Sequence, residues 1–214
     1  MNTLLHVFEG YAGLYLATKD AEVGQAMKRI LKIYRQKIYD PVSHCQKVFF
    51  DKNYDSILDL RSYGHDIESS WLIEWGCNLL EDPSLSREID TISGMIAEEI
   101  YHKAYTNHSV VNECVQGITD ETRVWWVQAE AVLGFLNQWE KNPQQMRFRD
   151  AASDVFNYIC ENIVDRRSGS EWFWCVDANN RPIPQKPIVE PWKCPYHNGR
   201  MCIELIRKDP DIYV

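Results

Sequence analysis

Four short polar and aromatic motifs recur along this chain at intervals of about 60 to 70 residues, and this recurrence is the strongest constraint on its fold. They contain His6, His65, the Trp125-Trp126 pair and His197. Each lies near the start of a segment whose apolar residues repeat with helical spacing. An interval of this length holds two helices and two connections, which is typical of stacked helix pairs. If every second helix brings its polar end to a common point, the four motifs converge on one site.

Apolar residues spaced at i, i+3, i+4 and i+7 predict about seven helices. Two of their starts carry capping signals, because Asp20 precedes the second segment and Asp82-Pro83 opens the fourth. The motifs lie on the odd members of the series, whereas the even members are ordinary amphipathic segments. This alternation predicts the inner and outer helices of an α/α toroid. The expected helices cover residues 3–17, 20–38, 66–80, 83–105, 122–140, 142–164 and 195–207.

Two segments depart from the helical pattern. Residues 40–63 are polar apart from a short apolar run at 47–50, which is compatible with a strand or an extended loop. Residues 166–191 contain four of the nine prolines and a turn-forming stretch at 177–180, and they predict a β-hairpin-like loop near 171–185. No linker or low-complexity stretch divides the chain, so residues 1–214 are predicted to form a single domain.

Composition excludes several classes of partner. A net charge of −8 argues against nucleic acid and against an anionic membrane surface. The chain has no run of 18 apolar residues, and its first residues lack the basic segment of a secretory signal. The seven cysteines are scattered and odd in number, as expected of reduced thiols. We therefore predict a cytoplasmic location and no membrane partner.

The motifs themselves favour a sugar-binding site. Eight Trp and eleven Tyr are present; most should be structural, but flat rings beside polar groups also stack on the C–H faces of a pyranose. His65 and Glu68 share a helix face at i and i+3, and Trp71 lies one turn further along the same stripe. Glu130 follows Trp126 by four residues, and the two adjacent indoles at 125 and 126 cannot both face the site.

Other chemistries are less well supported. Cys194 and His197 leave a metal pair open, but there is no CxxC or HExxH, so neither a metal nor another cofactor is expected. The absence of a glycine-rich phosphate loop and of GxSxG disfavours nucleotide and α/β-hydrolase chemistry. Glu68 and Glu130 leave glycoside hydrolysis possible. Two imidazoles instead favour removal and return of a proton at a carbon next to a carbonyl.

The remaining histidines, His44, His102 and His108, are predicted to lie on the surface.

Five strings in the chain carry a family resemblance. NTLLHVFEGY, SYGHDIESSWL, RVWWVQAEAVLGFLN, EWFWCVD and WKCPYHNGRMCIE resemble, in this order, motifs of the N-acylglucosamine 2-epimerase superfamily, and most closely its cellobiose 2-epimerase branch. The resemblance covers essentially the whole chain but only the C-terminal half of the family's sequence. It implies an all-α fold, a partial (α/α)6 barrel with about seven helices of a twelve-helix toroid. Leu4 stands where the family usually has a second histidine.

The resemblance also implies a reaction. His65 and His197 would act as acid and base on opposite faces of C2 of an opened reducing-end sugar. One imidazole would remove the C2 proton to form an enediol(ate), and the other would return a proton to the opposite face. The activity implied is reversible C2 epimerisation of β-1,4-linked disaccharides, cellobiose to glucosyl-mannose, with no metal or cofactor.

Further residues receive roles from the same resemblance. Glu68 would orient an imidazole, and His6 and Glu130 would contact the open-chain hydroxyls. The implied substrate-binding residues are Asn2, Asp66, Trp71, Trp125, Trp126 and Trp192.

Three alternatives stay open at this point. The chain could be an aldose–ketose isomerase or an N-acylglucosamine 2-epimerase of the same superfamily. It could also be a fragment without activity of its own, because a half toroid leaves apolar helix faces uncovered. Such faces predict pairing with a complementary N-terminal half or self-association.

Overall fold

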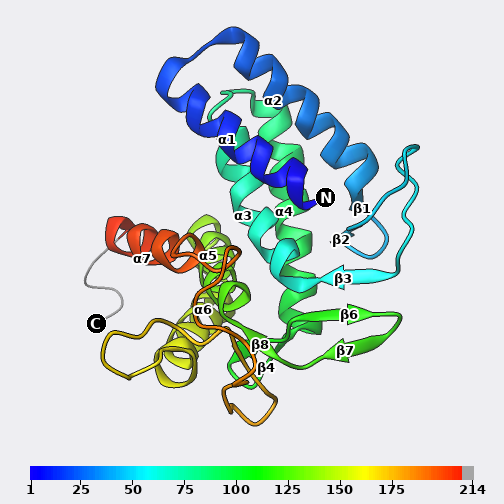
Figure 1. The fold of residues 1–214 in the computed structure, drawn as a ribbon. Coiled ribbons are helices and arrows are strands. Elements are labelled where there is room, and N and C mark those ends of the chain that lie inside the picture. The colour runs from blue at the N-terminus through cyan, green and yellow to red at the C-terminus, as the bar shows by residue number, and fades with distance from the viewer. Residues whose placement is uncertain (209–214) are drawn as a thin grey trace.

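The computed structural model describes residues 1–208, and α-helices dominate this part of the chain (Figure 1). The α-helices are α1 (Asn2–Thr18), α2 (Ala21–Ile33), α3 (Tyr63–Asn78), α4 (Pro83–Lys103), α5 (Trp125–Lys141), α6 (Met146–Tyr158) and α7 (His197–Lys208). Two of them, α2 and α6, each continue into one π-helical turn, η1 (Tyr34–Ile38) and η2 (Ile159–Ile163).

The odd-numbered helices form an inner series and the even-numbered ones an outer series. α1 packs on α3, α3 on α5 and α5 on α7, while α2, α4 and α6 pack on α1, α3 and α5 respectively. Accordingly, α3 and α5 are buried around most of their circumference, whereas α4 and α6 bury one apolar stripe. The predicted alternation is confirmed. Among residues 1–208, no helix is both long and apolar enough to cross a membrane.

Local sequence explains where the outer helices begin. The Asp20 carboxylate accepts hydrogen bonds from the backbone N–H groups of Glu22 and Val23 at the start of α2. Asp82 caps α4 in the same way through Leu85, and Pro83 occupies the first helical turn. Both predicted caps are confirmed.

Within the described part of the chain, four small antiparallel sheets accompany the helices. The largest has the strand order β3-β6-β7, and the others are β1-β2, β4-β5 and β8-β9. β3 leads directly into α3 and β8 directly into α5, so the sheets fix where these two inner helices begin. The strands are β1 (Tyr39–Asp40), β2 (Cys45–Gln46), β3 (Leu60–Ser62), β4 (Tyr105–Thr106), β5 (Ser109–Val110), β6 (Glu113–Val115), β7 (Ile118–Asp120), β8 (Arg123–Val124) and β9 (Cys175–Val176).

The structure corrects several predicted boundaries. The third helix begins at Tyr63 rather than Asp66, because β3 delivers the chain into it three residues earlier. The apolar run at 47–50 forms no strand beyond one bridge from Phe50 to Ser56. The predicted hairpin-like loop is confirmed: the chain turns back at 177–180 and Val176 bridges to Pro182, while the other edge of the Cys175–Val176 strand pairs with Arg123–Val124.

The crossing of α3 and α5 depends on a glycine. A Cβ at Gly134 would lie 2.5 Å from the Ile67 side chain and 2.9 Å from the Ile67 carbonyl oxygen. Gly134→Ala is therefore expected to lower the free energy of unfolding by about 1–3 kcal/mol through overpacking. Gly13→Ala is the matched control, because Gly13 lies in α1 and a Cβ added there would meet no atom within 4 Å.

That control should stabilise the protein by about 0.5–1 kcal/mol, the usual gain from alanine in a helix. Urea titration followed by circular dichroism measures both variants. Equal effects of the two substitutions would contradict a tight α3–α5 crossing.

Candidate active site

The inner helices bring the four sequence motifs to one cavity. Its volume is about 540 Å³, which is within the range of small-molecule sites. The histidines of three motifs and the Trp pair of the fourth all line it. The lining residues are Asn2, His6, Glu9, His65, Trp125, Trp126, Trp174, Pro191, Trp192, Cys194, Tyr196 and His197.

His197 lies against a buried carboxylate from α5. Its Nδ1 is 2.7 Å from Oε1 of Glu130, and the Glu130 side chain is fully buried. Trp71 donates its indole N–H to the other carboxylate oxygen at 3.0 Å. An ionised carboxylate only accepts hydrogen bonds, so His197 donates through Nδ1 and leaves Nε2 free. Asn198, the next residue, donates to Glu171 and ties the start of α7 to the 171–176 segment.

His6 has an equivalent partner on its own helix. Its Nδ1 lies 3.1 Å from Oε2 of Glu9, one turn along α1. This hydrogen bond raises the pKa of His6 above its ordinary value. Burial opposes ionisation of Glu9, but hydrogen bonds from His6 and Tyr196 and the charge of Arg200 outweigh it and lower the Glu9 pKa to about 2. Glu9 is therefore a permanent anion near neutral pH.

His65 is in a different state from the other two. Burial, and then the positive charges that His6 and His197 can carry, lower its pKa to about 4. Its Nδ1 lies 2.6 Å from the Ser62 hydroxyl rather than against a carboxylate. His65 is consequently neutral at pH 7 and can accept a proton from a ligand in the cavity.

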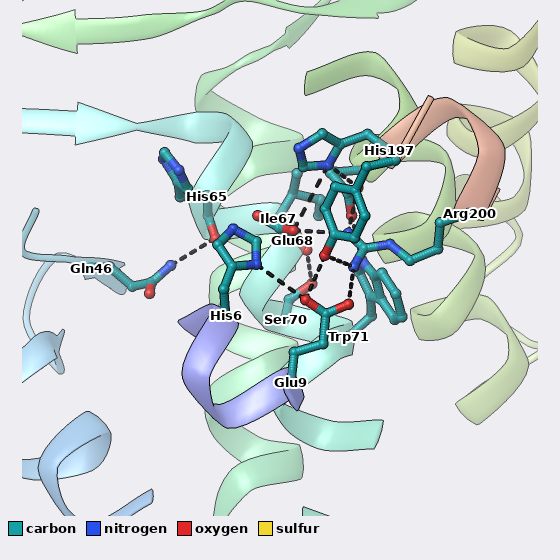
Figure 2. A network of polar contacts seen from close by, with 12 residues as sticks. His6, Glu9, Gln46, His65, Ile67, Glu68, Ser70, Trp71, His197 and Arg200 are labelled. Carbon is teal, nitrogen blue, oxygen red and sulfur yellow. Dashed lines mark hydrogen bonds and ion pairs between the residues drawn. The ribbon is translucent and has the colours of Figure 1, made fainter. Parts of the chain in front are cut away.

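Arg200 lies beneath the cavity and is a site residue that the sequence motifs alone did not single out. Its guanidinium contacts carboxylates from three other helices: Glu9 at 2.7 Å, Glu68 at 2.8 Å and Glu130 at 2.7 Å (Figure 2). Both Glu9 and Arg200 follow a motif histidine by three residues, His6 and His197 respectively, so helical spacing could have identified them.

The two fully buried carboxylates differ in charge. Burial and the neighbouring charge of Glu130 raise the pKa of Glu68 to about 7. Burial also opposes ionisation of Glu130, but the charge of Arg200 and the hydrogen bond from His197 lower its pKa below the ordinary value. Glu130 is thus the anion of the pair, and Glu68 readily holds a proton.

Several predicted binding residues do not reach the cavity. Asp66 is buried on another face of α3, where its carboxylate accepts from the Gln46 backbone N–H at 2.8 Å. Consecutive helical residues point about 100° apart, so Asp66 cannot share the direction of His65. Glu130 and Trp71 lie beneath the floor instead of lining it, because each is held by the other. Glu68 also lies below the lining residues.

Some of the predicted aromatic residues form the wall of the cavity, and Trp192 lies at its mouth. Trp125 is buried and Trp126 is partly exposed, and both line the cavity, although helix geometry alone indicated that only one of the two indoles would face it. Trp192 is 85% exposed at the mouth, and Asn2, which also lines the cavity, is exposed as well. Trp174 lines the same cavity and is a further residue that the sequence motifs did not single out.

The histidines predicted to lie on the surface lie outside the cavity. His102 and His108 are exposed. His44 is half-buried, because its ring contacts Tyr39, whose hydroxyl lies 2.8 Å from His44 Nδ1.

One group of side chains has the spacing of metal ligands. Glu68, Glu130 and His197 offer donor atoms within 4.8 Å of one another. The Arg200 guanidinium already lies between the two carboxylates and supplies the positive charge that a cation would bring. The donor set therefore fits a hydrogen-bonded ion cluster.

Comparison with known proteins assigns the chain to a family. The family model described as N-acylglucosamine 2-epimerase (GlcNAc 2-epimerase) matches residues 1–199. The chain belongs to this family. The cellobiose 2-epimerases of Dictyoglomus turgidum and Eubacterium cellulosolvens are 43% and 41% identical to it, over 97% and 99% of the chain. The resemblance of the five sequence strings is confirmed.

Solved structures agree with the family assignment. A sugar epimerase from a ruminal bacterium superposes with a TM-score of 0.96 at 40% identity, over 99% of this chain and 54% of that one. This match confirms the partial (α/α)6 barrel. The chain spans about half the length of the relatives it matches, 53% of the Dictyoglomus enzyme and 56% of the Eubacterium enzyme.

Proposed function

We propose that the cavity catalyses C2 epimerisation of the reducing-end sugar of a β-1,4-linked disaccharide such as cellobiose. The observation that carries the proposal is a pair of imidazoles that both contact one indole. The His65 and Trp126 ring centroids are 4.7 Å apart, and those of Trp126 and His197 are 5.3 Å apart. The names of the matched epimerases support the same substrate.

The two imidazoles suit opposite tasks. The neutral His65 can remove a proton from C2 of an open-chain sugar, while His197 can return one from the other face through Nε2. Glu130 holds His197 through Nδ1 and so orients the ring with Nε2 toward the cavity. His6 would donate to an oxygen of the enediol(ate), because its bond to Glu9 favours the charged ring. The roles of His65 and His197 reverse in the back reaction.

Product analysis separates this reaction from its nearest alternative. An aldose–ketose isomerase forms the same enediol but protonates C1, so it would give a fructose-type reducing end. A protein in which this chain is completed to the length of its relatives should convert cellobiose to a product with a mannose-type reducing end, detected by NMR of the anomeric protons. A fructose-type product would overturn the proposal. Turnover of N-acetylglucosamine in place of cellobiose would favour the other epimerase branch.

The separate 214-residue chain is expected to be weakly active or inactive. Apolar side chains are exposed on both flanking inner helices, Val7 (45%) and Leu14 (47%) on α1, Ile203 (51%) and Ile206 (67%) on α7. We propose that these faces pack against a complementary half or a second copy. Light scattering on a size-exclusion column, combined with the product assay, tests this. Robust epimerisation by the monomeric chain would contradict it.

A further inference from the structure

The Arg200 guanidinium joins four helices at a single point. From α7 it donates through Nη1 to Glu9 on α1, and through Nη2 to Glu68 on α3 and Glu130 on α5. The side chain is only 13% exposed. Its Cζ lies 4.4 Å from the Tyr196 ring centroid and 4.8 Å from that of Trp71, and these two rings restrict its rotation. Figure 2 shows Arg200 with Glu9, Glu68 and Trp71, beside His6 and His197.

Two of these carboxylates are also the partners of cavity histidines. Glu9 accepts from His6 and Glu130 accepts from His197, in both cases at Nδ1. Each carboxylate therefore stands between an imidazole and the same guanidinium. In both pairs Nε2 is the ring nitrogen that stays available to a ligand in the cavity.

Glu130 depends on this guanidinium for its negative charge, whereas Glu68 readily holds a proton. Glu68 and Glu130 are fully buried and share one Nη2 atom. Without this cation, the loss of solvent around Glu130 would favour its protonation or its displacement. A protonated Glu130 could no longer accept from Nδ1 in the same way, and His197 would lose its preferred tautomer.

We propose that Arg200 is a positioning residue that joins the pairs Glu9–His6 and Glu130–His197, so that both imidazoles present Nε2 to one cavity. A guanidinium suits this task because its rigid planar fork directs Nη1 to Glu9 and Nη2 to Glu68 and Glu130, whereas an ammonium is a compact point charge on a flexible stem. The consequence for catalysis rests on the proposed function. The positioning of the two rings does not, and can be measured separately.

Imidazole ¹⁵N–¹H spectra of the protein test the proposal at alkaline pH, where the neutral rings report their tautomers. In the wild type, both His6 and His197 should be predominantly Nδ1–H. In Arg200→Met, both rings should lose this predominance. Arg207→Met is the matched control, because Arg207 lies on the same helix and pairs with Glu204 at the surface. It should change neither ring.

Arg200→Lys allows the same measurement of the two histidine tautomers if Arg200→Met does not fold. The ammonium keeps the charge without the fork, so at most one of the two histidines should keep its wild-type tautomer. Full retention of both tautomers, either in Arg200→Lys or in a folded Arg200→Met, would overturn the proposal. If the tautomers change as expected but a completed protein does not epimerise cellobiose, the proposed function fails and the positioning role stands.

Discussion

His65→Asn is expected to lower the rate of C2 inversion by about 10²–10⁴-fold, the usual contribution of a positioned acid–base group. His197→Asn should have an effect of similar size. Asparagine keeps the polarity and part of the volume of the imidazole but cannot exchange a proton near neutral pH. The rate is measured with cellobiose, in a protein in which this chain is completed to the length of its relatives. His108→Asn is the matched control, because that exposed ring contacts Asp154 outside the cavity.

Deuterium exchange at C2 tests separately whether each imidazole acts on its own face of the sugar. If each imidazole serves one face of C2, a variant that lacks one of them still removes and returns the proton on the other face. In ²H₂O, His65→Asn should then exchange the C2 proton of only one of the two epimers, and His197→Asn that of the other. Exchange from the same epimer in both variants would contradict the two-face mechanism, even if inversion were lost in each.

The convergence of the motifs is predictable because it follows from helical period alone. The sequence pattern puts His6, His65 and His197 near the starts of alternate helices, and the structure brings all three to one cavity. Their spacing carries this information because each inner helix needs an outer partner and two connections. The capped starts at Asp20 and Asp82 are predictable for a similar reason, since a cap depends only on its own first turn.

What the sequence does not reveal depends on contacts between distant segments. Strand β3 pairs with β6, which lies beyond α3 and α4 in the chain, so that Ser62 faces Glu113, and no local pattern in either strand indicates the partner. The contacts of Arg200 are of the same kind, because each carboxylate comes from a separate helix. Asp66 lies away from the cavity for a simpler reason: it is next to His65 in sequence, but adjacent helical residues point in different directions.

Asp66→Asn is expected to change how stability depends on pH. Burial raises the pKa of Asp66 to about 7, against 3.8 for the free side chain, although hydrogen bonds from Gln46 favour the anion. A raised carboxyl pKa means that the folded state holds a proton which the unfolded state has lost. Stability therefore falls as pH rises from about 4 to 7, and above 7 the loss is complete, on the order of 4 kcal/mol for this group.

The variant removes this loss because an amide does not titrate, and its oxygen can still accept from Gln46. The measured quantity is the difference in unfolding free energy between Asp66→Asn and wild type, in which the titrations of His65 and Glu68 cancel. Between pH 5 and 8 this difference should shift by about 2–3 kcal/mol in favour of the variant.

Glu9→Gln is the control, because the pKa of Glu9 is shifted in the opposite direction to that of Asp66. The Glu9 pKa is depressed to about 2 from 4.5, so its contribution is present above pH 4.5 and disappears only as the pH falls further. A flat difference for Asp66→Asn from pH 5 to 8 would show that Asp66 is ionised in the folded chain throughout, which its complete burial makes unfavourable.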